Sequence, residues 1–425
     1  MAASIGEEQA KRAKTNGPQK SFTSAALDYW GEKVDKQEPG MPPFSANKHP
    51  IVAMNLASEI ITMVQDPDLI SEMWSTKAKF FTKHTIAERI FKPMLFKHFV
   101  FYPTNEAWRT ERKALSQMFY KEKLRIMIGV VKQHTELQYR KWIAEIEKNG
   151  EHRIDISEEF ERINAHALNH ICFGVDNNDD KFDFIVYDKY TDTFTERKVS
   201  FREAMGNMTA QAVTRVTKSL THPVTSMAWL LAGVELRWHK IEDVVQENSK
   251  RLYKHIWKYV QDRKNGVTKS EMNNVDLLAV HLENPQTFSD EHVVGGILGA
   301  LVAGIETSQY AMQTITTNLI KNKAIVGKLR KEFDEVVRKP AIAENADAAK
   351  LPTIDFLREY MHADQAFEMD YCNYVMQEGL RCGPPIGQGA WSVATQDVKV
   401  GKYQFKEGDI VSVGMDALGF NPAQW

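Results

Sequence analysis

The stretch "SDEHVVGGILGALVAGIETSQYAMQTITTNLIK", residues 289–321, decides the fold class of this 425-residue chain. Ser289 can cap the start of a helix, and Asp290 and Glu291 in the first turn complement the helix dipole. Apolar residues then recur with helical spacing to about Lys321, a length of about 45 Å. The first half is apolar almost all round, which is typical of a helix surrounded by other elements. We therefore predict a mainly α body with this helix through its centre.

The composition indicates a folded protein with no broad surface for nucleic acid. Hydrophobic residues make up 43% of the chain and charged residues 26%, as in globular proteins. The 54 basic and 56 acidic residues leave a net charge of -2, so no electrostatic footprint for nucleic acid exists. The longest uncharged apolar run, residues 293–305, is too short to cross a bilayer. We expect no transmembrane segment.

The remaining patterns predict a polar tail at residues 1–24 and a single domain at residues 25–425. Alternating apolar residues predict a small β-rich lobe built from residues 50–66 and 390–415. Ser157 is expected to cap a helix that stops at Gly174, and residues 184–201 fit either a strand pair or a loop. Helical spacing predicts further helices near residues 24–34, 67–74, 104–133, 240–266 and 369–381.

Four glycines and a Glu-Thr pair interrupt the apolar run. Each glycine costs about 1 kcal/mol relative to alanine in a helix, so the close approach of another body must offset that cost. One interpretation is a crossing with another helix, in which Thr307 bonds back to a carbonyl and Glu306 reaches a surface. The other is a flat cofactor lying across the helix, to which Glu306 and Thr307 relay protons. The glycines are Gly295, Gly296, Gly299 and Gly304.

Two further pairs of residues stand at helical spacing. Trp108 and Arg112 are one turn apart, which places an indole N–H donor and a guanidinium together, as suits a carboxylate. Glu378 and Arg381 are at positions i and i+3, within pairing range on one helix face. Each pair alone is common on solvated helices, so neither pair by itself indicates a function.

Taken in order, these strings resemble the cytochrome P450 family of haem-thiolate monooxygenases. "AWRTER" (107–112), "AGIETS" (303–308), "EGLR" (378–381) before two prolines, and "VGKYQFKEGDIVSVGMDALGFNPAQW" (400–425) follow the family's order, and the resemblance covers residue 25 to the end. It implies a mainly α fold with a small β-rich lobe and haem b as the cofactor. It also implies insertion of one oxygen atom from O2 into an apolar small molecule, with electrons from an NADPH-dependent reductase or a ferredoxin-like donor.

The resemblance also implies roles for individual residues. Apolar residues near Ile297, Leu301 and 91–101 would line a substrate pocket. The residues implied to act at the haem fall into three groups: Trp108 and Arg112 on a propionate, Ala303 and Gly304 in the oxygen-binding groove, and Glu306 and Thr307 in proton delivery. Glu378 and Arg381 would form a structural ion pair.

The chain departs from the family pattern at the iron ligand. Family members carry that cysteine a few dozen residues beyond the string that here ends at Trp425, so we expect the ligand beyond Trp425 and a fold without its C-terminal haem-ligand region. Ser392 also stands where many members carry a propionate-binding arginine. Cys172, Cys372 and Cys382 are expected to be small buried hydrophobes, without the electropositive, glycine-rich setting of a thiolate.

Two interpretations of the chain follow from this departure. In the first, it belongs to a haem-thiolate monooxygenase, and these 425 residues alone retain haem poorly and are inactive. In the second, it is a non-catalytic P450-like interaction scaffold that has lost haem binding. The cost of keeping a glutamate and four glycines within one helix favours the enzyme.

Three expectations concern other parts of the chain. His166 and His170 stand one turn apart and could chelate a metal, but they share an apolar stripe, so we interpret them as core histidines. Lys121, Lys123 and Arg125 indicate either a docking face for an acidic electron donor or an ordinary solvated face. The sequence leaves the location open between the cytoplasm and the periphery of the endoplasmic reticulum, both of them intracellular.

Overall fold

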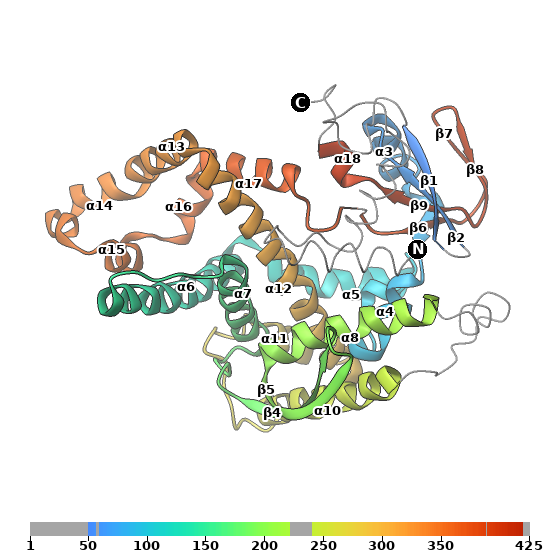
Figure 1. Cartoon of the computed structure of the whole chain (residues 1–425), viewed down its shortest axis with the longest axis horizontal. Coiled ribbons are helices and arrows are strands. Elements are labelled where there is room, and N and C mark those ends of the chain that lie inside the picture. Colours follow the sequence, from blue (N-terminus) through green and yellow to red (C-terminus); the bar gives the residue numbers. More distant parts are fainter. Residues whose placement is uncertain (1–49, 57–58, 222–239, 388, 420–425) are drawn as a thin grey trace. The chain divides into compact units, whose positions relative to one another are not determined.

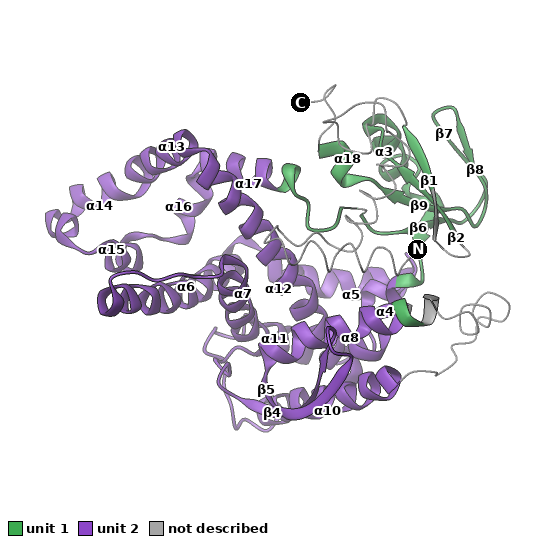
Figure 2. Cartoon of the chain, viewed as in Figure 1, with its two compact units in different colours: residues 1–86, 217–237, 380–425 green, residues 87–216, 238–379 purple. Residues whose placement is uncertain are grey.

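The computed structural model describes residues 50–56, 59–221, 240–387 and 389–419. Its contacts divide the chain into two compact units, each considered by itself (Figure 2). Unit 1 comprises residues 1–86, 217–237 and 380–425, and unit 2 comprises residues 87–216 and 238–379. The expected tail and the helix expected at residues 24–34 lie outside the described residues. The single-domain interpretation of residues 25–425 stays a prediction.

Unit 1 contains the β-rich lobe that the alternating patterns predict. Its five-stranded sheet has the order β1-β2-β9-β6-β3, in which β2 and β9 pair in parallel and the other neighbours pair antiparallel. The elements of this lobe are β1 (Ile51–Leu56), β2 (Glu59–Val64), α3 (Pro67–Trp74), β3 (Phe81–Lys83), β6 (Ser392–Ala394), β9 (Ile410–Val413) and α18 (Met415–Gly419), together with the separate hairpin of β7 (Val398–Val400) and β8 (Tyr403–Phe405). The short strand β3 and the helix α18 were not predicted.

Residues far apart in the sequence form the core of this lobe. Val64, Phe81 and Val411 pack in one buried cluster with Met73 of α3 and Phe405 of β8. Because alternate side chains of a strand point to one face, these strands bury their apolar residues on the same side of the sheet. The short strand β3 pairs with β6 from Phe81↔Ala394 to Lys83↔Ser392.

Unit 2 is mostly helical (Figure 1). Its helices are α4 (Ile86–Leu95), α5 (Glu106–Ser116), α6 (Lys121–Asn149), α7 (Ile156–Phe173), α8 (Phe201–Thr221), α10 (Lys240–Lys264), α11 (Leu277–Leu282), α12 (Asp290–Lys321), α13 (Lys323–Phe333), α14 (Lys339–Glu344), α15 (Thr353–Tyr360), α16 (Ala363–Glu368) and α17 (Asp370–Cys382), with α4, α8 and α17 crossing the boundary with unit 1. The strands β4 (Lys181–Asp188) and β5 (Thr193–Ser200) form a hairpin. The mainly α fold with a small β-rich lobe is therefore confirmed.

Helix α12 has the bounds that the sequence predicts. Ser289 is its N-cap, and a capping box joins Ser289 to His292. Val293 and Ile297 are almost completely buried in the main core cluster, which also includes Leu301. Beyond Leu301 the burial becomes one-sided, because Ala303, Glu306 and Tyr310 are exposed. The helix is thus surrounded by protein in its first half only.

The sequence predicted the type of the next two elements correctly, but it misplaced the start of one of them. Helix α7 ends before Gly174 as expected, but its N-cap is Asp155 and not Ser157. The carboxylate of Asp155 accepts hydrogen bonds from the backbone N–H groups of Ser157 and Glu158, so the helix begins earlier. The strand-pair alternative for residues 184–201 is confirmed by the β4–β5 hairpin.

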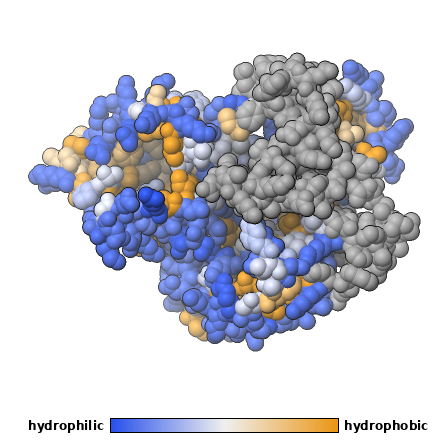
Figure 3. All heavy atoms as spheres, viewed as in Figure 1, coloured by the Kyte–Doolittle hydropathy of each residue, from blue (hydrophilic) through white to orange (hydrophobic). Residues whose placement is uncertain are grey.

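The described surface is mostly hydrophilic, with separate hydrophobic patches in the view of Figure 3. Some large apolar side chains are open to solvent, among them Ile320 and Tyr374, each 63% exposed. Among the described helices, none is both long enough and apolar enough to cross a membrane.

Candidate active site

One face of α12 carries the residues that the sequence singles out. Ala303, Glu306, Thr307 and Tyr310 follow the i, i+3, i+4, i+7 spacing that places side chains on one helix face. Ala303, Glu306 and Tyr310 are exposed and Thr307 is half-buried. The chain therefore presents a small apolar residue, a carboxylate and a hydroxyl on one accessible surface.

The hydroxyl of Thr307 bonds back along the helix. Its Oγ1 donates to the carbonyl oxygen of Ala303 at 2.5 Å. This bond occupies the only proton of the hydroxyl, whereas the oxygen lone pairs remain able to accept a hydrogen bond. Both local features of the helix-crossing interpretation, the bond of Thr307 and the exposure of Glu306, are thus present. Neither excludes a role in proton transfer.

Glu306 has an electrostatic setting suited to exchanging a proton near neutral pH. Although its side chain reaches solvent, the protein around the carboxyl disfavours the charged form and raises its pKa to about 7. The negative charge of Glu161 adds to this shift, although Glu161 itself pairs with Arg202 at 3.0 Å. Perturbed carboxyl pKa values are common at catalytic sites and also occur in structural networks.

The glycines of α12 lie against protein. A Cβ at Gly304 would meet Cδ1 of Leu168 on α7 at 2.7 Å. A Cβ at Gly295 would overlap the carbonyl oxygens of Leu95 and Lys97, and Gly296 and Gly299 are each covered by a histidine ring. Close packing against protein is therefore sufficient reason for all four glycines. The role of Gly304 in a haem groove stays a prediction that rests on the resemblance alone.

Trp108 and Arg112 come together as their spacing predicts. The guanidinium carbon of Arg112 lies 5.5 Å from the centre of the Trp108 ring, in cation–π contact. Asn105 starts their helix, α5, and accepts a hydrogen bond from the backbone N–H of Trp108 at 3.0 Å. Arg112 is exposed, so its N–H donors can reach a carboxylate outside the protein core.

A partly buried polar network that the sequence did not reveal joins α5 to the first turn of α12. Nε2 of His292 lies 2.8 Å from Oη of Tyr102 and 3.3 Å from the carboxylate of Glu111. Glu111 is 7% exposed, and burial together with Glu111 raises the pKa of Tyr102 to about 12. Tyr102 and His292 are 190 positions apart, so helical spacing could not have paired them.

The family assignment rests on this architecture and on sequence comparison. The cytochrome P450 family model matches residues 41–425. The chain belongs to the cytochrome P450 family. It is 24% identical over 338 residues to geranylhydroquinone 3''-hydroxylase CYP76B74 of Arnebia euchroma and 23% identical over 335 residues to cytochrome P450 71B1 of Thlaspi arvense. Each match covers 77% of this chain but only 59% of the relative, so the P450 chain spans about three fifths of the length of these relatives.

The P450 chain fits a haem in part. Ala303 and Thr307 offer small side chains on an accessible helix face, and the Trp108–Arg112 stack offers donors for a carboxylate such as a propionate. An iron ligand is harder to find among the described residues. Burial raises the pKa of Cys172, which is 1% exposed, and burial together with Glu332 raises the pKa of Cys372, so both thiols are held neutral.

Cys382 differs from the other two cysteines and corrects one expectation. Nη2 of Arg381 lies 3.3 Å from its Sγ, so this thiol does have a cation beside it. The same guanidinium donates from Nη1 to the carbonyl oxygen of Gly419. The predicted Glu378–Arg381 ion pair stays a prediction. Ser392, where the resemblance implies a propionate-binding arginine in many family members, is buried in β6.

The structure disagrees with the expected substrate-pocket residues and with the expected docking face. Ile297 and Leu301 are 0% and 1% exposed in the main core cluster, so they do not line an open substrate pocket. The proposed docking cations are partly neutralised, since Asp364 lies 2.7 Å from Arg125 and 3.9 Å from Lys121. The alternative of an ordinary solvated face therefore fits these cations better.

Proposed function

We propose that this P450 chain contributes the oxygen-side face of a haem-thiolate monooxygenase that inserts one oxygen atom from O2 into an apolar small molecule. The observation that carries the proposal is the accessible face of α12, where Glu306 has a pKa of about 7 next to the hydroxyl of Thr307. A carboxyl that is half-protonated near neutral pH is matched to proton delivery.

The residues of the chain have separate tasks in this proposal. Haem b, when bound, supplies the redox chemistry with O2. Arg112 and Trp108 would hold a propionate and so orient the ring, and the small side chain of Ala303 would allow a flat ring to approach the helix. Glu306 takes a proton from solvent, and the hydroxyl oxygen of Thr307 accepts a hydrogen bond and orients the proton donor. Electrons come from an NADPH-dependent reductase or a ferredoxin-like donor.

The substrate class is inferred from one relative of known activity. The relative from Arnebia euchroma is named as a hydroxylase of geranylhydroquinone. At 24% identity we extend to the present chain only the type of reaction, hydroxylation of an apolar small molecule.

A non-catalytic scaffold is the second candidate function. The observation that favours it is that each glycine of α12 packs on protein and that Thr307 bonds to its own helix. In this alternative, the geometry of α12 needs no haem to explain it. The scaffold gives no reason for the stack of the exposed Arg112 on the half-buried Trp108.

Haem titration of the purified full chain separates the two candidates. We expect weak but saturable haem binding by the parent chain. Arg112→Ala should weaken it about tenfold or more, because a charge-assisted hydrogen bond contributes about 1.5–3 kcal/mol. Arg109→Ala is the matched control, since Arg109 is exposed on the same helix and pairs with Glu106. Equal haem affinity of the two variants, or no saturable binding by the parent chain, would favour the scaffold.

A further inference from the structure

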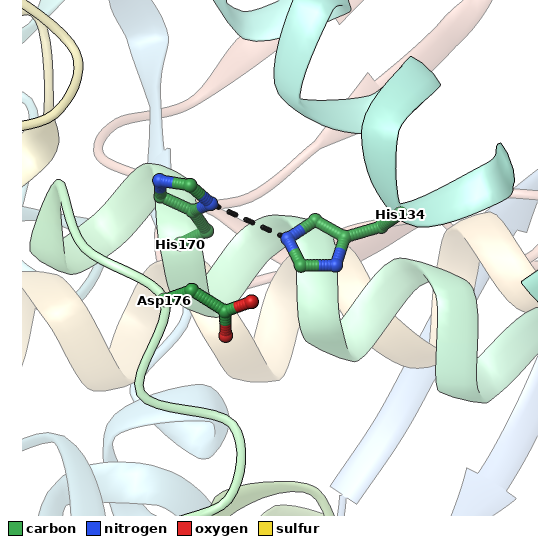
Figure 4. A group of neighbouring side chains, drawn as sticks. All are labelled: His134, His170 and Asp176. Atoms are coloured by element: carbon green, nitrogen blue, oxygen red, sulfur yellow. Dashed lines mark hydrogen bonds between the residues drawn. The ribbon is translucent and has the colours of Figure 1, made fainter. Parts of the chain in front are cut away.

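Two histidines and an aspartate from separate segments meet in unit 2. His134 lies on α6, His170 lies on α7, and Asp176 follows the end of α7 (Figure 4). One donor atom from each residue lies within 4.8 Å of the other two. His166 and His170 were interpreted from their spacing as core histidines, and the imidazole next to His170 belongs to His134 on another helix.

The distance between the two imidazoles suits shared coordination of one ion. Nε2 of His134 lies 3.3 Å from Nδ1 of His170. In a tetrahedral site with metal–nitrogen bonds of about 2.0–2.1 Å, two nitrogen ligands stand about 3.3–3.4 Å apart. An N–H···N hydrogen bond would ordinarily be shorter, at about 3.0 Å. Both rings are buried, with 4% and 3% exposure, so water does not compete for them freely.

The surroundings of His170 provide the outer support that metal-bound histidines commonly have. Its second nitrogen, Nε2, is buried without a well-formed hydrogen bond and lies 3.3 Å from the carboxylate of Glu271. A histidine that binds a metal through Nδ1 carries its proton on Nε2 and donates it to such a carboxylate. The backbone N–H of Glu271 in turn donates to the carbonyl oxygen of Gly174 at 2.7 Å, which holds this segment at the end of α7.

Asp176 is held in place by a neighbour and is open to solvent. Its Oδ1 accepts from the backbone N–H of Asn178 at 3.2 Å and from the side-chain amide of Asn178 at 2.7 Å. The amide of Asn178 also donates to the carbonyl oxygen of His166 on α7. These bonds fix the loop and occupy one carboxylate oxygen, and the exposed side provides a path for an ion and a water ligand.

We propose that His134, His170 and Asp176 form a binding site for a divalent transition-metal ion, with Zn²⁺ as the best match. Two neutral imidazoles and one carboxylate are a ligand set that Zn²⁺ accepts, and a water molecule would complete four-fold coordination. Glu271 orients His170 from the outer shell. The competing interpretation is a hydrogen-bonded pair of core histidines beside a surface aspartate.

Cobalt titration of the metal-free, haem-free full chain tests the site. Co²⁺ replaces Zn²⁺ in such sites and absorbs visible light when it is four-coordinate. We expect one equivalent of Co²⁺ to bind with visible absorption bands that Zn²⁺ abolishes by displacement. Asp176→Asn should weaken Co²⁺ binding at least tenfold, and Glu271→Gln should weaken it about 10- to 100-fold.

Asp179→Asn is the matched control, because Asp179 is an exposed aspartate three positions away and outside the cluster. It should bind Co²⁺ within twofold of the parent chain. Asp176 and Asp179 are both exposed, so neither substitution disturbs the core, whereas replacing a buried histidine could unfold the chain. Absence of the visible bands, or equal Co²⁺ affinities of Asp176→Asn and Asp179→Asn, would overturn the site and leave a hydrogen-bonded histidine pair.

Discussion

Replacing Gly295 of α12 with alanine should destabilise unit 2, whereas the same replacement at Gly129 of α6 should stabilise it. Both glycines lie inside helices of one unit. A Cβ at Gly295 would overlap the carbonyl oxygens of Leu95 and Lys97, while a Cβ at Gly129 would meet nothing within 4 Å. The change in helix propensity is the same at the two positions, so the difference in stability between the two variants measures the effect of close packing alone.

The magnitudes follow from two opposing effects. Glycine to alanine inside a helix contributes about 1 kcal/mol of stability, which is the full expected effect at Gly129. At Gly295 the added methyl group is opposed by backbone atoms, which cannot swing aside, so an overpacking cost of about 3 kcal/mol applies. The net expected loss is about 2 kcal/mol. At Gly304 the obstacle is a flexible leucine tip at 2.7 Å, so we expect a net change of about zero.

Urea unfolding followed by circular dichroism measures these differences. The expected order of stability is Gly129→Ala above the parent chain, Gly304→Ala near the parent, and Gly295→Ala below it. If Gly295→Ala unfolds at the same urea concentration as Gly129→Ala, the close packing described for α12 is wrong. A loss at Gly304 as large as that at Gly295 would mean that Leu168 cannot move.

Three further predictions concern the candidate site. The folded-state pKa of Glu306, about 7, exceeds the ordinary value of 4.5, so the folded chain binds this proton more tightly and loses stability as the pH rises from about 4.5 to 7. Glu306→Gln should therefore gain stability relative to the parent chain over that pH range. A difference in stability that does not change with pH would contradict this. In a catalytically active chimaera that carries the haem-ligand loop of a plant relative after Trp425, Thr307→Ala should raise the yield of peroxide relative to product, and Thr317→Ala, an exposed control on α12, should not. The purified 425-residue chain supplied with haem should give no thiolate-type carbon monoxide difference spectrum; if such a spectrum appears, serine substitution of Cys382 and then of the other two cysteines will identify the ligand.

Features governed by neighbours in the sequence were predictable. The bounds of α12 at Asp290 and Lys321 followed from a capping serine and a sustained helical period. The pairing of Trp108 with Arg112 likewise depends only on one helical turn. The N-cap of α7 was missed because two capping residues, Asp155 and Ser157, stand close together and either could begin the helix.

Features governed by contacts between distant segments were not predictable. The glycines of α12 indicate close approach, but the sequence does not say whether the approaching body is Leu168 or a cofactor. Strand β3 has three residues, too few for a period, and it exists because β6 pairs with it. His134 meets His170 only because α6 packs on α7, so helical spacing, which places His166 and His170 on one helix, gave no sign of this contact.

Hydrogen–deuterium exchange of the full chain, with and without saturating haem, tests most directly whether the accessible face of α12 receives the cofactor. We predict slower exchange on haem addition in residues 302–310 of α12 and 106–116 of α5, because haem would cover Ala303 and Thr307 and immobilise the Trp108–Arg112 stack. Exchange in α13 to α16 should not change. Protection that leaves residues 302–310 unaffected, or that appears elsewhere alone, would contradict the proposed site.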